Sequence, residues 1–296
     1  MDTQPDHSAQ LPIDQVLDVR NATCRAITTY DRRLVRQLDH ILPDDLLNGR
    51  DFRKMVLRDN YPLPADLFRE GYCLGNDISY WLHGLVSYLK VMNTVQRRGI
   101  QPQSILDFGS ASGRVVRHFR NQLDDATVWA ADINPNHIRW LTTHFPLRLR
   151  AVVVGELPGL PIADNSFDLI CAFSVFTHID ELEMNWLAEL RRVMRPGGLC
   201  YFTIHNDETW HALSKLSPEN RLIKSMLKTP TFEIEQLHQP IPQGKTAYHF
   251  AKDGLYCSQV FHSNDYLMDV WGQFFEIIEV QPCAHQNQSV VVMAKR

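Results

Sequence analysis

The chain has 296 residues, of which 44% are hydrophobic and 22% charged, as in an ordinary globular protein of one large or two small domains. Its formal net charge of −4 comes without long basic or acidic runs. This argues against general electrostatic binding to nucleic acid or to an anionic membrane. No apolar stretch approaches the ~20 residues that cross a bilayer, so we expect no membrane span.

The N-terminus and the cysteines indicate where the protein works. Residues 1–12 are polar and acidic, unlike a signal peptide, and we expect them to be disordered. The six cysteines show no C-x-x-C or C-x-x-H spacing, which argues against a disulfide framework and a structural zinc site. We therefore expect a cytoplasmic protein without a metal.

A helical pattern extends to about residue 100. Apolar residues recur at three- and four-residue spacing in 17–42 and more clearly in 76–99. Asp77 can cap the second segment and Gly99 can end it. Residues 1–100 are thus predicted to be a disordered start followed by a helical N-terminal extension.

The pattern then changes to short apolar runs that alternate with amphipathic segments. The predicted strands are 104–109, 127–133, 149–154, 166–173 and 198–205, and the predicted helices are 113–123, 134–145 and 180–194. Largely apolar strands, most of them followed by a helix, predict a parallel sheet that is covered on both faces.

The last third has a different character. Residues 206–254 are mixed in pattern and are predicted to be a lid, because such additions to a fold often carry specificity. A helix capped by Ser263 is predicted over 263–274. Strands at 274–280 and 289–295, joined by a short polar connection, predict an antiparallel hairpin.

The turn after the first predicted strand, LDFGSASG, has small residues at Gly109, Ala111 and Gly113. This one-three-five spacing differs from the one-three-six spacing of the dinucleotide fingerprint. Asp107 lies just upstream, where it would repel a pyrophosphate but could accept a hydrogen bond from an ammonium group. The turn therefore favours a ligand such as S-adenosylmethionine. The alternative is a glycine turn that serves packing alone.

A second acid supports a nucleoside ligand. Asp132 ends the second predicted strand, 25 residues after Asp107. A carboxylate there can accept both ribose hydroxyls of an adenosine, and hydrogen bonds to a charged group contribute about 1.5–3 kcal/mol each. The alternative is an aspartate that caps the following helix.

These residues, together with 159–179 and 189–205, resemble the class I S-adenosylmethionine-dependent methyltransferases. LPIADNSFDLI (160–170) is similar to that family's approach to its fourth strand, and LRRVMRPGG (190–198) to the turn before its fifth. A narrower resemblance, in 105–119, 174–179 and 261–282, is to bacterial methyltransferases associated with glycan biosynthesis.

The resemblance implies an α/β fold with a Rossmann-like seven-stranded sheet, mostly parallel with an antiparallel last strand. The methyltransferase domain would span 101–296, with the lid 206–254 inserted between strands five and six. The implied cofactor is S-adenosylmethionine, with S-adenosylhomocysteine as its product.

Carried over position by position, the resemblance also implies the cofactor-binding residues. The turn from Asp107 to Gly113 would hold the methionine part, Asp132 the ribose and Ile133 the adenine. Glu156 and Leu157 would meet the adenine amine and ring edge, while 173–174 would supply backbone contacts beneath the cofactor. The full predicted set is Asp107, Gly109, Ser110, Ala111, Gly113, Arg114, Asp132, Ile133, Glu156, Leu157, Phe173 and Ser174. Ala111 departs from the glycine that the family prefers.

Three histidines are candidates for a general base, since an imidazole can accept a proton near neutral pH. His178 and His205 follow the fourth and fifth strands, and His262, with Tyr256 and Gln259, comes from a later segment that could return over the pocket. For these last three residues, a position in a surface loop is the alternative. For His178, a loop residue bonded to backbone is the alternative. We interpret Asp180 and Glu181 as acids at a helix N-terminus, where their negative charge interacts favourably with the helix dipole, rather than as catalytic residues.

The predicted function is O-methylation of a sugar or other small-molecule hydroxyl, with no nucleic-acid partner and with a homodimer as one possible assembly. The alternatives within this fold are an N-methyltransferase and a non-catalytic module that binds S-adenosylmethionine. A nicotinamide-dependent oxidoreductase is the alternative from another enzyme class. The spacing of the turn and Asp107 count against it.

Overall fold

The computed structural model of the chain describes residues 42–145, 149–250 and 258–296. The predicted disordered start and nearly all of the predicted helix at 17–42 therefore lie outside the described residues. Within the described residues, four elements precede the sheet: α2 (Asp44–Leu47), α3 (Phe52–Leu57), the 3-10 helix η3 (Asp66–Phe68) and α4 (Asp77–Arg97). Within the described residues, no helix combines the length and apolar character needed to cross a membrane.

The long helix α4 confirms the helix predicted at 76–99, but its cap differs by one residue. Asn76 has extended dihedral angles and its side chain accepts from Ser79 N at 2.9 Å, so Asn76 is the N-cap. Asp77 instead forms an ion pair with Arg69. Gly99 follows the end of the helix with a φ of +69°.

Seven strands form one sheet in the order β3-β2-β1-β4-β5-β9-β8. Neighbours among β1 to β5 are parallel, and β9 runs antiparallel to both β5 and β8. This confirms the predicted mostly parallel, Rossmann-like sheet with an antiparallel last strand. The strands are β1 (Ser104–Phe108), β2 (Thr127–Asp132), β3 (Leu149–Val153), β4 (Phe167–Ala172), β5 (Met194–Ile204), β8 (Glu276–His285) and β9 (Gln288–Ala294).

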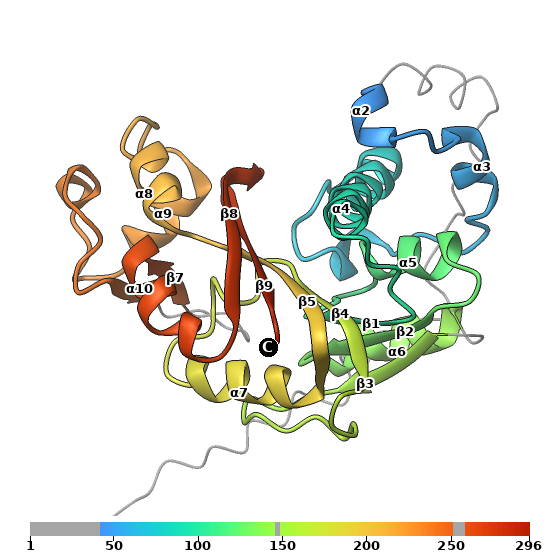
Figure 1. The fold of residues 1–296 in the computed structure, drawn as a ribbon. Helices are drawn as coiled ribbons and strands as arrows, with labels where there is room; N and C mark the ends of the chain where they lie inside the picture. Colours follow the sequence, from blue (N-terminus) through green and yellow to red (C-terminus); the bar gives the residue numbers. More distant parts are fainter. Residues whose placement is uncertain (1–41, 146–148, 251–257) are drawn as a thin grey trace, which may run out of the picture.

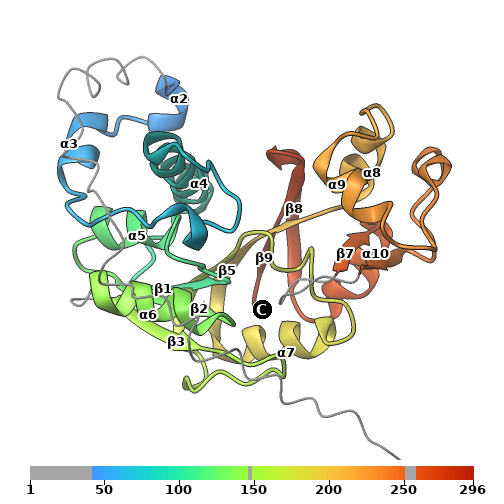
Figure 2. The same ribbon diagram turned by 180° about the vertical axis from the view of Figure 1, so that it is seen from behind.

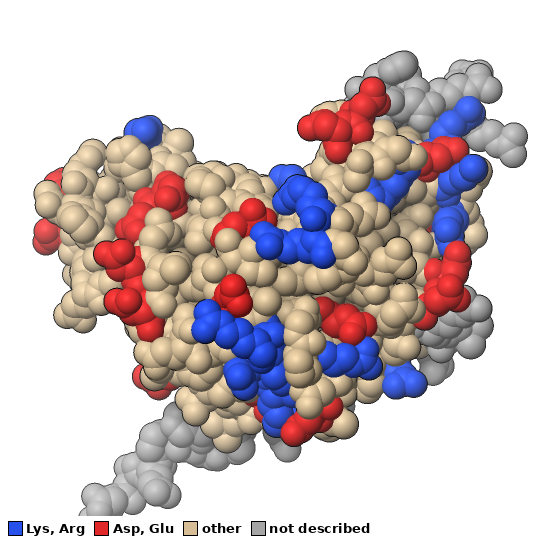
Figure 3. Space-filling model, viewed as in Figure 1, with Lys and Arg blue, Asp and Glu red and all other residues tan. Residues whose placement is uncertain are grey.

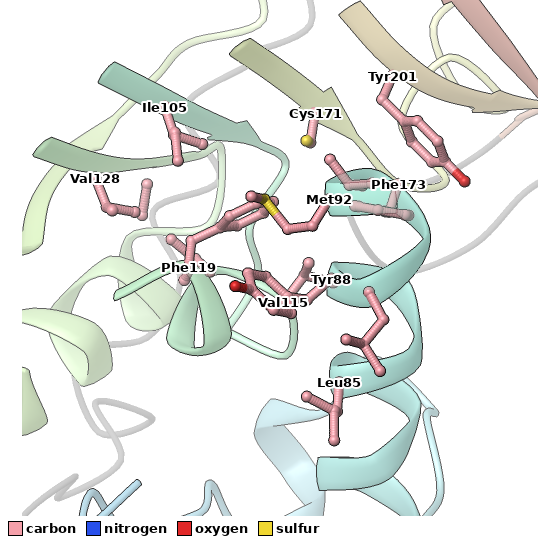
Figure 4. Packing of buried hydrophobic residues seen from close by; sticks show 14 of the residues in the cluster. Leu85, Tyr88, Met92, Ile105, Val115, Phe119, Val128, Cys171, Phe173 and Tyr201 are labelled. Atoms are coloured by element: carbon pink, nitrogen blue, oxygen red, sulfur yellow. The ribbon is translucent and has the colours of Figure 1, made fainter. Parts of the chain in front are cut away.

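Helices cover both faces of the sheet because alternate strand residues are apolar on both sides. On β1, Ile105 joins the core formed with α4, α5 (Val116–Gln122) and α6 (Pro135–His144). Leu106 joins the opposite core, formed with α7 (Glu183–Val193), α10 (Asn264–Asp269) and the 3-10 helix η5 (Trp271–Gln273). Figure 4 shows part of the first core, where side chains of α4 meet Phe119 and the strands.

A glycine lets α4 approach the start of α5 closely. A Cβ on Gly84 would lie 1.9 Å from the carbonyl oxygen of Arg114. Backbone-to-backbone packing of this kind fixes α4 directly against the turn that follows β1.

The insertion after β5 has a core of its own and a secondary structure that the sequence pattern did not predict. It contains α8 (Asp207–Leu213), α9 (Arg221–Met226), the 3-10 helix η4 (Ile234–His238) and the two-stranded sheet of β6 (Lys245–His249) and β7 (Ser258–His262). Trp210, Ile223 and Phe261 are among the apolar side chains buried there.

The structure confirms the predicted antiparallel hairpin at the end of the chain, but its first strand is longer than predicted. Strand β8 continues to His285, so most of the polar segment predicted as a connection is strand, and only 286–287 link β8 to β9. The register shifts between Gln281 and His285, and Cys283 has a φ of +45°. This irregularity lets polar residues remain in the strand.

The N-terminal helices and the insertion stand on either side of the sheet. In Figure 1 the helices α2 to α4 lie at one side, and α8, α9 and α10 lie at the other. Figure 2 shows the same separation from behind. The space-filling view in Figure 3 shows a surface that is hollowed between the two parts.

The turn between β1 and α5 takes left-handed backbone angles at each of its small residues. The φ angle is +74° at Gly109, +45° at Ala111 and +92° at Gly113. A Cβ on Gly109 would lie 2.2 Å from Val175 Cγ2, and one on Gly113 would lie 2.6 Å from Leu141 Cδ2. Both glycines therefore combine a left-handed φ with close side-chain neighbours, whereas Ala111 carries a side chain at a conformation that favours glycine.

We expect Ala111→Gly to raise the free energy of unfolding by about 0.5–1 kcal/mol, because relief of the left-handed strain exceeds the added entropy of the unfolded chain. Urea unfolding measures this change. The matched control is Ala212→Gly inside α8, which should lower the same free energy by about 1 kcal/mol. Equal losses in both variants would contradict the strain at Ala111.

Candidate active site

A cavity of about 1300 Å³ opens at the carboxyl ends of the parallel strands. In open α/β sheets ligands bind at this edge. The turns after β1, β2, β4 and β5 form its floor. Three further parts enclose it: segment 69–73 of the N-terminal extension, α9 of the insertion, and the hairpin tip at 286–288.

Asp107 lies on β1 with a side chain that is 2% exposed and lines the cavity. Burial raises the pKa of this carboxyl to about 7; the positive charge of Arg114 opposes the shift and the negative charge of Asp132 adds to it. A cation in the cavity would stabilise the ionised carboxylate. The site is therefore suited to a ligand that carries an ammonium group.

Asp132, at the end of β2, holds several parts of the site together. Its Oδ2 accepts from Ala111 N at 2.7 Å, and its Oδ1 accepts from Asn134 N at 2.8 Å. The His137 ring lies against the same Oδ1, at 3.3 Å. The N-cap of α6 is Asn134, whose side chain accepts from Asn136 N, so Asp132 is not itself the helix cap.

Most of the predicted cofactor-binding residues meet at this cavity. The lining includes Asp107, Gly109, Ser110, Ala111, Arg114, Asp132, Ile133, Glu156, Phe173 and Ser174. Gly113 and Leu157 lie outside it. Gly113 packs against α6, and Leu157 is 75% exposed, so the structure does not bring these two residues to the cavity wall.

Arg114 points towards the N-terminal extension. Its guanidinium lies 4.3 Å from the centre of the Tyr72 ring and donates to His83 Nδ1 at 2.8 Å. Tyr72 in turn contacts Ser174, with 3.0 Å between their hydroxyl oxygens. Arg114 thus connects the turn after β1 to the segment that covers the cavity.

His205 presents a buried ring nitrogen at the carboxyl end of β5. The ring is 4% exposed, lines the cavity and stacks on Phe261 with 4.9 Å between centroids. Its Nδ1 has no hydrogen-bond partner among the described residues. Burial lowers the pKa of His205 to about 3, helped by His178 and His262 and opposed by a hydrogen bond to the Val260 backbone. At neutral pH the ring is therefore uncharged.

His178 also lines the cavity, and its ring contacts the backbone as the alternative interpretation expected. Its Nδ1 lies 2.7 Å from the Ser258 carbonyl oxygen. Thr177, beside it, has a fully buried hydroxyl without a partner in the described residues and lines the same cavity. Gln259 reaches the cavity as well, and Tyr256 lies outside the described residues.

His262 is not brought to the cavity. It is fully buried in the insertion, its Nε2 lies 2.9 Å from Glu183 Oε2, and it is absent from the cavity lining. The negative charge of Glu183 explains this position, because the buried carboxylate also accepts from Trp271 Nε1 at 2.6 Å and lies 3.0 Å from Lys245 Nζ. The structure thus corrects the prediction that placed His262 over the pocket.

Sequence reasoning did not single out several residues that build this cavity. Glu70, Tyr72 and Arg221 all line it, from segments that carry no recognisable motif. The one sequence signal in this part of the cavity is Gly71, because a glycine can predict a left-handed turn. The residue does have a left-handed φ of +79°. Among the described residues, no group of three or more His, Cys, Asp or Glu side chains is arranged to hold a metal ion.

Comparisons with known proteins agree with this geometry. A family model described as a methyltransferase domain matches residues 106–202. The malonyl-[acyl-carrier protein] O-methyltransferase of Hahella chejuensis is 29% identical over 150 residues, which cover 50% of this chain and 46% of that protein. The ubiquinone/menaquinone biosynthesis C-methyltransferase of Cupriavidus necator is 29% identical over 151 residues, covering 49% of this chain and 59% of that protein.

A solved structure shares the fold. The PH0226 protein from Pyrococcus horikoshii OT3 aligns with a TM-score of 0.51 at 16% identity, over 75% of this chain and 93% of that one. The chain spans about half the length of the curated relatives that it matches. Residues 106–202 form a class I methyltransferase domain, of the kind that uses S-adenosylmethionine as methyl donor.

Proposed function

We propose that this chain transfers a methyl group from S-adenosylmethionine to the hydroxyl of a small molecule, with a histidine at the acceptor. The observation that carries the proposal is His205, which lines the same cavity as Asp107 and Asp132, whose ring is uncharged at neutral pH, and whose buried Nδ1 has no partner among the described residues. The carboxylates of Asp107 and Asp132 would attract the cationic cofactor, and the neutral ring of His205 could accept a hydrogen bond from a hydroxyl.

The residues present fit the cofactor. Asp107 offers a buried carboxylate for the ammonium of the methionine part, and the absence of a Cβ at Gly109 leaves the turn compact. Asp132 accepts from two backbone N–H groups and contacts the His137 ring through Oδ1, and its Oδ2 retains a lone pair for a ribose hydroxyl. Ile133 and Glu156 lie on the wall beside it, where an adenine would fit.

The cavity has room for an acceptor as well. Its volume of about 1300 Å³ exceeds the ~300–1000 Å³ of common small-molecule pockets. Thr177 and His205 both line this space, and each has one buried polar atom without a partner in the described part of the chain. Because buried polar groups normally make hydrogen bonds, these two atoms favour a polar acceptor at this position.

The reaction needs alignment and removal of one proton. When bound, S-adenosylmethionine supplies an electrophilic methyl group on a positively charged sulfur. The chain's residues hold the acceptor oxygen in line with that methyl, and such positioning supplies roughly 7–11 kcal/mol. His205 would accept a hydrogen bond from the acceptor hydroxyl and would take its proton as the new C–O bond forms and the methyl–sulfur bond breaks, leaving S-adenosylhomocysteine; general-base catalysis of this kind contributes about 10²–10⁴-fold.

The acceptor itself is left open by the relatives. Their names specify an O-methyltransferase and a C-methyltransferase, and neither name refers to a glycan. The sugar acceptor that the narrower resemblance implied is therefore kept only as one member of the hydroxyl class. A non-catalytic binding module is excluded by turnover of any acceptor.

We expect the affinity for S-adenosylhomocysteine to fall as the pH falls below 7. The free Asp107 carboxyl has a pKa of about 7, and the ligand's ammonium would lower it, so binding displaces a proton at acidic pH. The expected loss between pH 7.5 and 5.5 is about tenfold or more, measured by calorimetry. Asp107→Asn should bind weakly with little slope over this range. An equal slope in both proteins would contradict the role of Asp107.

Replacing the cavity histidine should slow turnover without weakening cofactor binding. We expect His205→Gln to lower kcat by about 10²-fold, with the affinity for S-adenosylhomocysteine within about twofold of wild type. The assay measures transfer of tritiated methyl to a panel of hydroxyl compounds that includes sugars and phenols.

The matched control is His238→Gln, an exposed residue outside the cavity lining, which should behave as wild type. His178→Gln tests the second candidate base in the same assay. The hydroxyl mechanism is wrong if both cavity replacements leave turnover unchanged.

A further inference from the structure

Segment 69–73 lines the cavity and contacts the residues after β4 on one side and α6 on the other. At one end of the segment, Arg69 donates to the Pro64 carbonyl at 2.9 Å and to the Cys73 carbonyl at 3.3 Å. Tyr72 reaches the end of β4, where its hydroxyl contacts Ser174. Glu70 reaches the opposite wall, at β2 and α6.

The contact of Glu70 passes through a buried histidine. His137 Nε2 lies 3.0 Å from Glu70 Oε1, and its Nδ1 lies 3.3 Å from Asp132 Oδ1. The His137 side chain is 1% exposed and that of Asp132 is 2% exposed. One ring therefore connects the predicted ribose-binding acid to the segment that covers the cavity.

The charges support this connection. Burial alone would lower the pKa of His137, but the hydrogen bonds and negative charges of Asp132 and Glu70 raise it to about 9. The ring is thus a cation between two carboxylates at neutral pH. A group with a raised pKa contributes its stabilisation below that pKa and loses it as the pH rises through it.

The backbone of the segment indicates that Glu70 is held in place. Glu70 has a φ of +49° and Gly71 a φ of +79°. A left-handed non-glycine residue costs about 1–2 kcal/mol, so surrounding contacts must maintain it. A Cβ on Gly71 would lie 2.9 Å from the guanidinium nitrogens of Arg221, so the insertion covers the segment from above.

We propose that His137 is a positioning residue whose ring holds Glu70 against Asp132 and thereby fixes segment 69–73 over the bound cofactor. This inference rests on the proposed function, because it takes Asp132 as part of the cofactor site. The contact would slow cofactor release and keep Tyr72 beside Ser174, where strand β4 meets the cavity.

Cys73 provides a reporter within the segment itself. It is partly exposed and lines the cavity, whereas Cys171 and Cys200 are buried in the sheet. Alkylation of Cys73 by iodoacetamide, followed by peptide mass spectrometry, measures access to the segment. In wild type we expect saturating S-adenosylhomocysteine to slow this alkylation about tenfold, as a segment opening that costs about 1.4 kcal/mol more would do.

Two variants separate positioning from folding. In Glu70→Gln and His137→Asn we expect Cys73 to lose its protection at saturating ligand, and the affinity to fall about tenfold, equivalent to one charge-assisted hydrogen bond. Cys171 and Cys200 should stay unreactive, which shows that the sheet remains folded. Glu235→Gln, an exposed residue outside the cavity lining, is the matched control and should match wild type.

The pH profile gives a further readout. The ratio of Cys73 alkylation rates without and with ligand should approach one above pH 9 in wild type, where the His137 ring gives up its proton. Retained protection in both variants would overturn the inference while leaving the proposed function intact. Absence of S-adenosylhomocysteine binding to wild type in calorimetry would instead overturn the proposed function, and the inference with it.

Discussion

The carboxylate of Asp132 connects the parts of this protein that must act together. It accepts from Ala111 N in the turn after β1 and from Asn134 N before α6, and through His137 it reaches Glu70. Because β1 and β2 are parallel neighbours, their ends deliver the turn and the acid to the same edge of the sheet. The turn, the end of β2, α6 and the N-terminal extension are thus fixed relative to one buried group.

The cavity is divided electrostatically. The wall formed by β1 and β2 carries Asp107 and Asp132, and burial, with a smaller contribution from the negative charge of Asp132, raises the pKa of Asp107 despite the positive charge of Arg114. The wall near β5 carries His205, whose lowered pKa keeps it neutral. A cationic donor and a neutral acceptor are suited to opposite walls, which is the arrangement that direct methyl transfer between them requires.

Much of this was predictable from local sequence. Alternation of apolar runs with amphipathic segments predicted the parallel sheet, and the one-three-five spacing with Asp107 and Asp132 indicated the turn and the acids of the site. The family resemblance implied the rest of the set, and ten of its twelve residues line the cavity. Each of these features depends on neighbours in sequence or on the strand-helix repeat. The predicted cap of α4, Asp77, was wrong by one residue. Asn76 and Asp77 are both residue types that cap helices, and the observed cap is Asn76.

Features that depend on contacts between distant segments were not predictable. His262 is held within the insertion by Glu183, 79 residues earlier, and Leu157 is exposed because the connection from β3 to β4 turns it outward. Segment 69–73 gains its place from Ser174 after β4, His137 in α6 and Arg221 in α9. No periodicity within the segment itself specifies such partners.

The central claim is that the glycine turn and Asp132 hold an adenosyl sulfur cofactor. Calorimetric titration of S-adenosylhomocysteine into wild type, Asp132→Ala and Asp132→Asn tests it most directly, with reduced nicotinamide cofactor as the control ligand and thermal unfolding as the check on folding. We expect micromolar binding by wild type, clearly weaker binding by both folded variants, and no binding of the control. Failure of folded wild type to bind S-adenosylhomocysteine, or equal binding by the variants, would contradict the claim.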